Sequence, residues 1–184
     1  MAQTLYQLPV TGLSASLQKG YIPIPLGSWR ILAASVTTNI AVASGNGGQL
    51  ALDTAPILER VNGATDKKLR LRWVASNVTE IVANIEYPPD LDDLSPVVIH
   101  LLMAMSGATD VPTIAVAYFE GLGDANAGGN TAALSSSIVD RTVTIAAGDV
   151  GPAPAAASIA LVPAAHGTDA IHFYGAWAEY TRKS

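Results

Sequence analysis

The chain has 184 residues, a length typical of one domain that can bury a core of its own. Hydrophobic residues make up 49% of the chain and charged residues 14%, against about 25% charged residues in an average soluble domain. This composition argues against a disordered chain and indicates a surface that is partly covered in a homo-oligomer. The net charge of −5 argues against nucleic acid as a partner, because neutralising phosphates requires clustered lysine and arginine.

The absence of cysteine excludes disulfides, thiolate metal sites and cysteine nucleophiles. No uninterrupted apolar run reaches the ~18 to 20 residues that span a bilayer, and the N-terminus lacks a basic segment followed by an apolar one. We therefore expect a protein that is made and folded in the cytoplasm and has no membrane partner.

The first 26 residues differ from the rest, because prolines and glycines interrupt them repeatedly. In Ile22-Pro23-Ile24-Pro25 the two prolines fix an extended backbone and remove two amide donors, which argues against an interior strand or a helix. We predict an extended arm over residues 1–26, either docked on a neighbour or frayed, and a β-sandwich domain over residues 27–184. The apolar residues expected to bind a partner are Leu5, Tyr6, Leu8, Val10, Tyr21, Ile22 and Ile24.

The segment from Ser28 to Ala43 is ambiguous. Its first part, Arg30 to Ala34, is compatible with the start of a helix, whereas the β-branched residues after Val36 favour a strand. Gly45-Asn46-Gly47-Gly48 then ends this element, because glycine and asparagine accept a positive φ at little cost.

From residue 57 onward, apolar runs of strand length recur between turn signals. No convincing helix separates them, which argues against a parallel α/β sheet and favours an all-β antiparallel sandwich. The expected strands are Leu69–Ala75, Glu80–Tyr87, Val97–Met105, Thr113–Phe119, Arg141–Ala146, Ala157–Val162 and Ala170–Thr181, with Ile57–Val61 and Val36–Val42 as weaker candidates.

The connecting segments carry turn chemistry. Asn62-Gly63, Ser106-Gly107 and Gly128-Gly129-Asn130 supply residues that accept a positive φ. The tetrapeptide Gly-Ala-Thr-Asp occurs at residues 63–66 and 107–110, and Gly167-Thr168-Asp169 repeats its end. Because the spacings differ, we interpret these as reused turns and not as the period of a solenoid.

The last expected strand carries aromatic residues on both faces. Strict alternation divides its large residues into two sets, Ile171, Phe173 and Trp177 on one face and His172, Tyr174 and Tyr180 on the other. Two aromatic faces imply that both are covered, one by the second sheet and the other by a further partner.

The polar residues do not form a recognisable catalytic or cofactor site. Asp90, Asp92 and Asp93 lack the spacing of a calcium loop and are ordinary turn residues. His100, His166 and His172 are interpreted as hydrogen-bonded structural histidines. The chain has neither a Gly-x-Ser-x-Gly elbow nor a phosphate-binding loop, so we expect no enzyme, no metal and no cofactor.

Aromatic residues leave one binding hypothesis open. One interpretation is that they form a platform on which a sugar stacks. The interpretation that we favour here is that they fill the core or an interface. The residues concerned are Trp73, Trp177, Tyr174, Tyr180 and His172.

Five segments together resemble a known family and cover most of the chain from residue 20 to residue 180. They are Gly20-Tyr21-Ile22-Pro23-Ile24-Pro25-Leu26, Thr54-Ala55-Pro56-Ile57-Leu58-Glu59-Arg60-Val61-Asn62-Gly63-Ala64-Thr65-Asp66, Leu69-Arg70-Leu71-Arg72-Trp73, Pro88-Pro89-Asp90-Leu91-Asp92, and Leu161-Val162-Pro163 through His166-Gly167-Thr168-Asp169 to Trp177-Ala178-Glu179-Tyr180. In these segments the chain resembles small virion structural proteins of tailed bacteriophages.

The resemblance implies a jelly-roll-like β-sandwich that decorates or cements the capsid. Its partners would be copies of itself, as a homotrimer, and the major capsid protein, and its location the capsid surface of the virion after synthesis in the host cytoplasm. Many weak contacts would then be multiplied by valency into firm retention. The alternative is a tail or spike-associated β-sandwich module that binds glycans or other virion proteins.

Overall fold

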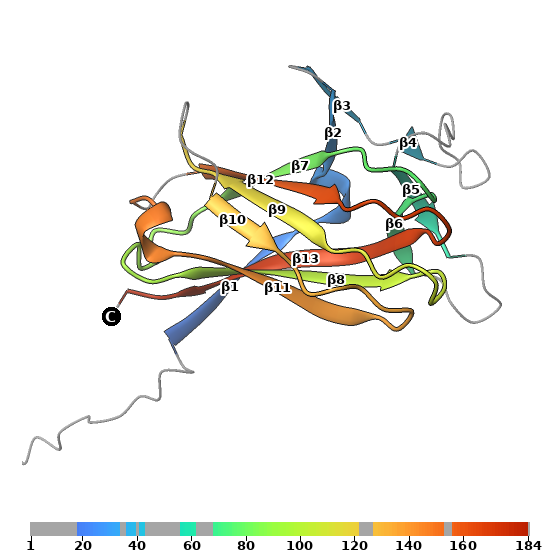
Figure 1. Cartoon of the computed structure of the whole chain (residues 1–184). Coiled ribbons are helices and arrows are strands. Elements are labelled where there is room, and N and C mark those ends of the chain that lie inside the picture. Colours follow the sequence, from blue (N-terminus) through green and yellow to red (C-terminus); the bar gives the residue numbers. More distant parts are fainter. Residues whose placement is uncertain are drawn as a thin grey trace, which may run out of the picture.

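The computed structural model describes residues 18–33, 36–39, 41–42, 56–61, 68–121, 127–152 and 156–183. These residues form thirteen β-strands and two short 3-10 turns, and the strands make two sheets that lie one over the other (Figure 1). Paired strands are antiparallel, except for β4 and β5. The predicted all-β, antiparallel, jelly-roll-like sandwich is therefore confirmed. No helix in this described part is long and apolar enough to cross a membrane.

One sheet, which we call sheet A, is organised around its longest strand. This strand, β13 (Ile171–Thr181), pairs on one side with β8 (Val97–Met105), and β8 pairs in turn with β11 (Val139–Ile145). On its other side β13 pairs with two strands, one along each half of its length. The strands on that side are β6 (Leu69–Trp73) with β5 (Ile57–Arg60) and β4 (Ala41–Val42) beyond it, and β1 (Lys19–Ile24).

The other sheet, sheet B, has six strands in the order β10-β9-β12-β7-β2-β3. Its centre is formed by β9, β12 and β7, which carry alternating apolar residues toward sheet A. The bounds are β2 (Arg30–Ala33), β3 (Val36–Asn39), β7 (Ile81–Glu86), β9 (Ile114–Phe119), β10 (Ala127–Asn130) and β12 (Ala156–Pro163).

The core lies between the sheets and includes a cluster of three large rings. The chain passes from sheet A to sheet B through a 3-10 turn at residues 26–28, and Trp29 follows it into the interior with no exposed surface. Its ring meets Phe173 edge-on at 5.4 Å, and Phe173 lies 6.3 Å from the ring of Trp73. Burying such side chains stabilises the fold by roughly 1.5–3 kcal/mol each, so this cluster fixes the two sheets against each other.

The strands expected between residues 69 and 181 are all present within two residues of their predicted bounds. The ambiguous segment after residue 28 begins with a strand, β2, so its helical alternative is wrong for the described residues. The turn predicted at residues 128–130 is also wrong, because these residues belong to β10. Gly128 has a φ of +125° there, and a Cβ would lie 2.1 Å from the carbonyl oxygen of Val116, so only glycine fits this close approach.

Part of the predicted arm belongs to sheet A. Residues 19–24 form β1, a short strand that contains Pro23 and pairs on one side with β13, as the missing amide donor requires, and Pro25 follows it at the start of the 3-10 turn. Ile24 is buried and Ile22 packs against the core, whereas Tyr21 is 61% exposed. The other predicted partner-binding residues, Leu5, Tyr6, Leu8 and Val10, lie outside the described residues.

The predicted alternation of β13 is wrong in its second half, because the strand contains a β-bulge. The register with β8 shifts between Phe173 and Gly175, so one extra residue, Tyr174, enters β13 without a partner of its own. Trp177 therefore lies on the same face as His172, whereas Tyr180 turns inward and is 5% exposed. A single inserted residue exchanges the faces of everything that follows it.

The repeated Gly-Thr-Asp turns hold the β8–β9 and β12–β13 loops together. Asp110 accepts hydrogen bonds from the amides of Thr168 and Asp169 at 2.7 and 2.8 Å, and Asp169 accepts from Thr109 and Asp110 at 2.7 and 3.0 Å. Hydrogen bonds from the Asp169 and Thr168 amides hold the pKa of Asp110 below its ordinary value. The recurring motif is therefore a reciprocal clamp between two loops, and its third copy, at residues 63–66, lies outside the described residues.

Candidate functional site

The side of sheet A that faces away from the core carries most of the aromatic and charged side chains of that sheet. Alternation along each strand assigns side chains to this side, because the opposite set is buried in the core. We call it the aromatic face. Its members are Tyr21 and Pro23 on β1, His172, Tyr174, Trp177 and Glu179 on β13, Val98, His100 and Leu102 on β8, Asp140, Thr142 and Thr144 on β11, Arg70 and Arg72 on β6, and Glu59 on β5.

Trp177 and His100 form the centre of the aromatic face. They lie opposite each other on β13 and β8, and their rings stack at 4.7 Å with an angle of 11° between the planes. Pro23 lies opposite Trp177 on β1, and Thr142 lies opposite His100 on β11, so one row crosses four strands. The indole is partly exposed, unlike the two other tryptophans, which are fully buried.

Two carboxylates flank this stacked pair. The Nδ1–H of His100 donates to Asp140 Oδ2 at 2.8 Å, and the side chain of Asp140 is 41% exposed. Glu179 Oε2 lies 3.9 Å from Nε2 of His100, and its other oxygen forms an ion pair with Lys19 at 3.0 Å. The hydrogen bond to Asp140 sets the tautomer and the orientation of the imidazole. Trp177 is thus stacked on a ring whose position is fixed from the neighbouring strand.

The bulge leaves open space beside Trp177. Gly175 faces outward opposite Leu102, and apart from its chain neighbours no atom lies within 4 Å of the position a Cβ would take. Tyr174, the extra residue of the bulge, is partly exposed and meets the ring of His172 edge-on at 6.4 Å. The space over Gly175, which lies between Tyr174 and Trp177 along β13, is therefore open.

A second polar cluster lies on the β6 side of the aromatic face. The carboxylate of Glu59 accepts hydrogen bonds from Nε of Arg70 at 2.7 Å and from Nε of Arg72 at 3.0 Å. A terminal nitrogen of Arg70 also lies 3.2 Å from Nδ1 of His172. Burial works to raise the pKa of Glu59, but the hydrogen bonds from Arg70 and Arg72 outweigh it and leave the pKa below its ordinary value. The two guanidinium groups are therefore held by one carboxylate.

His172 is the neutral member of this second cluster. Burial, aided by the positive charge of Arg70, lowers the pKa of His172 to about 4. Since Arg70 donates to Nδ1, the neutral imidazole carries its proton on Nε2. The cluster is a compact, internally paired network and not a set of unpaired charges.

The outward side of sheet B, which we call the neutral face, has a different composition. Among the described outward positions of β7, β9 and β12, only Glu86 is charged. The central row runs Val82, Ala160, Ala117 and Gly128 across four strands, and Ala160 is 1% exposed. This central row carries no charge and consists of small side chains.

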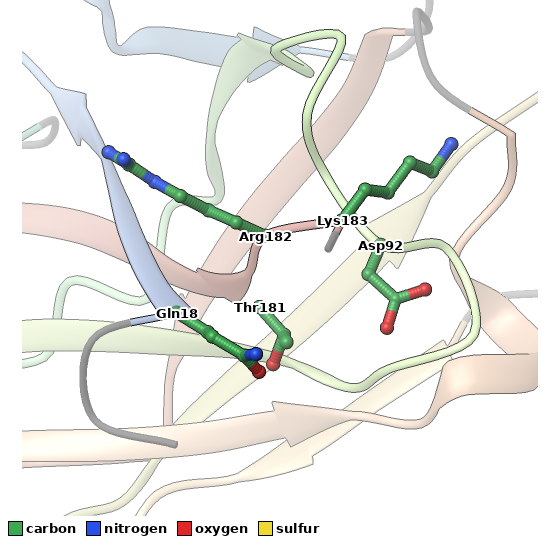
Figure 2. A pocket seen from close by; sticks show the side chains of 5 residues that line it. All are labelled: Gln18, Asp92, Thr181, Arg182 and Lys183. Carbon is green, nitrogen blue, oxygen red and sulfur yellow. The ribbon is translucent and has the colours of Figure 1, made fainter. Parts of the chain in front are cut away.

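A separate polar hollow of about 350 Å³ lies where β1 and β13 meet the β7–β8 loop. Figure 2 shows the side chains of Gln18 and Thr181 converging on it, while those of Arg182 and Lys183 point away from each other. Asp92 accepts hydrogen bonds there from Ser95 Oγ at 2.6 Å and the Leu94 amide at 3.2 Å, so it acts as a turn residue.

The other predicted site residues have structural roles. Asp90 accepts from the Tyr180 hydroxyl at 3.0 Å, and Asp93 lies 3.7 Å from Lys183. No group of three or more potential metal ligands occurs among the described residues. His166 is buried and bonds to the carbonyl oxygens of Ala164 and Val74, as predicted for a structural histidine.

Of the five residues in the sugar-platform hypothesis, the structure brings three together on the aromatic face. These are His172, Tyr174 and Trp177, whereas Trp73 and Tyr180 are core residues. His100, Asp140 and Glu179 were not predicted as site residues. The polar residues within otherwise apolar or β-branched strands were the available signal, but only the strand register places them beside Trp177.

Comparison with known proteins gives neither a matching family model nor a matching curated protein. Among solved structures, the chain is similar to the xylan-binding module CBM15, with 12% identity and a TM-score of 0.48, covering 90% of this chain and 99% of that one. It is also similar to TmCBM61 in complex with beta-1,4-galactotriose, with 8% identity, a TM-score of 0.45, and coverage of 84% and 88%. For Xylanase10C from Cellvibrio japonicus in complex with xylopentaose, the identity is 13%, the TM-score 0.47, and the coverage 86% of this chain and 28% of that chain.

Proposed function

We propose that this protein is a non-catalytic binding module that recognises a carbohydrate on the aromatic face. The observation that carries the proposal is the stacked pair of Trp177 and His100, fixed by Asp140 and left partly exposed on the outer side of sheet A. A large aromatic ring that stays open to solvent, with oriented polar groups around it, is typical of a ligand site.

The chemistry of a sugar fits this arrangement. A pyranose ring has apolar C–H surfaces that pack on aromatic rings, and its hydroxyl groups donate to carboxylates. Asp140 and Glu179 provide such acceptors at His100, the ring stacked on Trp177, and hydrogen bonds to charged groups are stronger than those between neutral groups. The open space over Gly175 leaves room beside Trp177 for part of a sugar ring.

The proposal is tested by screening the purified protein on a glycan array. We expect binding to at least one glycan class, and we expect the Trp177→Ala variant to lose it by at least a hundredfold in affinity. Leu94→Ala is the matched control, because Leu94 is 86% exposed in the β7–β8 loop, away from the aromatic face. A protein that binds no glycan, or a Trp177→Ala variant that binds as well as the parent, would contradict the proposal.

The neutral face favours a second candidate function, that of a virion structural protein. We propose that this face packs against another copy of the chain, as the resemblance to bacteriophage decoration proteins implies for a homotrimer on the capsid. Small uncharged residues such as Ala115 and Ala117 allow close contact at little desolvation cost.

Sedimentation analysis followed by electron microscopy of purified particles tests this second function. A trimer bound to the capsid surface would support it. A monomer at micromolar concentration that is absent from particles would argue against it. The two functions are compatible, because they use opposite sides of the sandwich.

A further inference from the structure

We propose that the carbohydrate bound on the aromatic face is uncharged, and that Asp140 and Glu179 exclude glycans bearing carboxylates or sulfates. This inference rests on the proposed carbohydrate-binding function and concerns the class of sugar. It follows from how the charges of the aromatic face are arranged and paired.

Around Trp177 the described residues place two carboxylates and one ammonium group. The ammonium of Lys19 lies 3.0 Å from Glu179, so its charge is already compensated. Among the described residues, Asp140 forms no ion pair with a lysine or arginine and is held by the Nδ1–H of His100. Two carboxylates against one ammonium group favour ligands that donate hydrogen bonds over ligands that bring further negative charge.

Arg70 and Arg72 do not change this balance. Both guanidinium groups point at the carboxylate of Glu59, and the side chains of all three residues are no more than 26% exposed. Recognition of a carboxylate or sulfate ordinarily uses the planar donor fork of arginine. Here Nε of Arg70 and Nε of Arg72 both donate to Glu59 on the β6 side of the face, and a terminal nitrogen of Arg70 lies against His172. An acidic sugar at Trp177 would therefore meet Asp140, whose charge no lysine or arginine among the described residues compensates.

The partial burial of this region strengthens the effect. The side chains of His100 and Glu179 are 15% and 23% exposed, so like charges brought close to them are screened less than on an open surface. A neutral hydroxyl in the same place would donate to a carboxylate and gain a charge-assisted hydrogen bond. Both carboxylates therefore favour hydroxyl groups, and Asp140, which has no lysine or arginine partner among the described residues, also repels anions.

The test uses pairs of oligosaccharides that differ only in charge. Isothermal titration calorimetry would compare each neutral glycan that binds with its sialylated, sulfated or uronate counterpart. We expect every acidic counterpart to bind at least tenfold more weakly than its neutral form. Equal or tighter binding of the acidic form would overturn the inference and leave carbohydrate binding intact, whereas no binding to any glycan would overturn both proposals.

Two conservative variants show which groups carry the selectivity. Asp140→Asn keeps an acceptor for His100 and removes one negative charge, and Glu179→Gln does the same on the other side. We expect each to weaken binding of the neutral glycan several-fold, because a charge-assisted hydrogen bond becomes a neutral one, and to narrow the ratio of neutral to acidic affinities severalfold. Glu86→Gln, which removes a charge from the neutral face, is the control and should leave the preference unchanged. An unaltered preference in both aromatic-face variants would contradict the inference.

Discussion

The two outer faces of the sandwich have the same backbone architecture and opposite chemistry. On the aromatic face, a row across four strands contains Trp177 and His100, and acidic and basic groups surround it. On the neutral face, the equivalent central row contains Val82, Ala160 and Ala117. An antiparallel sheet fixes where side chains point but not what they are, so one fold can present a binding face and a flat packing face at once.

The core beneath both faces is shared, and its loss should have the largest effect. In Phe173→Ala the ring contacts with Trp29 and Trp73 are lost, and we expect a destabilisation of about 3–5 kcal/mol. Urea unfolding measures this loss. A change below about 1 kcal/mol would mean that the two sheets are not held together by this cluster.

Among the described residues the neutral face has no counterpart to the paired network of the aromatic face, and breaking that network should have the next largest effect. Glu59→Ala leaves Arg70 and Arg72 without their carboxylate, and we expect a loss of about 2–3 kcal/mol in the free energy of unfolding. Glu86→Ala is the matched removal of a carboxylate from the neutral face, where we expect a change within about 0.5 kcal/mol. Equal losses of unfolding free energy in Glu59→Ala and Glu86→Ala would contradict the proposed difference between the two faces.

The neutral His172 should make stability depend on pH. Its pKa is about 4 in the folded protein, below the ordinary value of 6.5. The unfolded chain therefore takes up a proton between pH 6.5 and pH 4 that the folded chain does not, and stability is highest above pH 6.5 and decreases as the pH falls through this window. We expect a loss of about 2 kcal/mol. Unfolding measured at several pH values checks this prediction.

The control for this pH effect is His172→Gln, whose amide cannot titrate. The difference between the parent and the variant isolates the histidine from carboxylates that titrate nearby, such as Glu59. A variant with the same pH dependence as the parent would show that His172 is not the responsible group.

The smallest expected effect on ligand binding is that of a charge placed on the neutral face. We expect Ala117→Lys to change glycan affinity by less than twofold, because Ala117 and Trp177 lie on opposite outer sides of the sandwich. The same variant should dissociate an oligomer built on the neutral face, which sedimentation measures. Reduced glycan binding without any change in oligomeric state would contradict the assignment of separate roles to the two faces.

Strand positions were predictable from the sequence because apolar alternation and turn residues both indicate them. β8 was predicted with its observed bounds, since its nine residues are almost entirely apolar. β10 was not, because Gly128 and Gly129 have no side chains to form a pattern and are equally typical of turns. Local sequence patterns thus identify a strand whose apolar side chains are buried. They miss a strand such as β10, which is held mainly by backbone pairing with its neighbour.

The candidate site was much less predictable. Its centre joins Trp177 to His100, 77 positions earlier, and Asp140 to His100 across 40 positions, and only the register of three strands brings them together. The bulge at Tyr174 then reversed the expected faces of Trp177 and Tyr180. A bulge depends on tertiary pairing and leaves little trace in one sequence, so the alternation rule fails there for a physical reason.

The three tryptophans allow one direct test of the aromatic face, because two of them, Trp29 and Trp73, are fully buried in the core and Trp177 is not. In a nitrogen–proton correlation spectrum, a titration with an uncharged oligosaccharide should move the indole signal of Trp177 and leave the other two within their line widths. If the Trp177 signal does not shift while signals of other residues shift with increasing sugar concentration, carbohydrate binding at this site is contradicted.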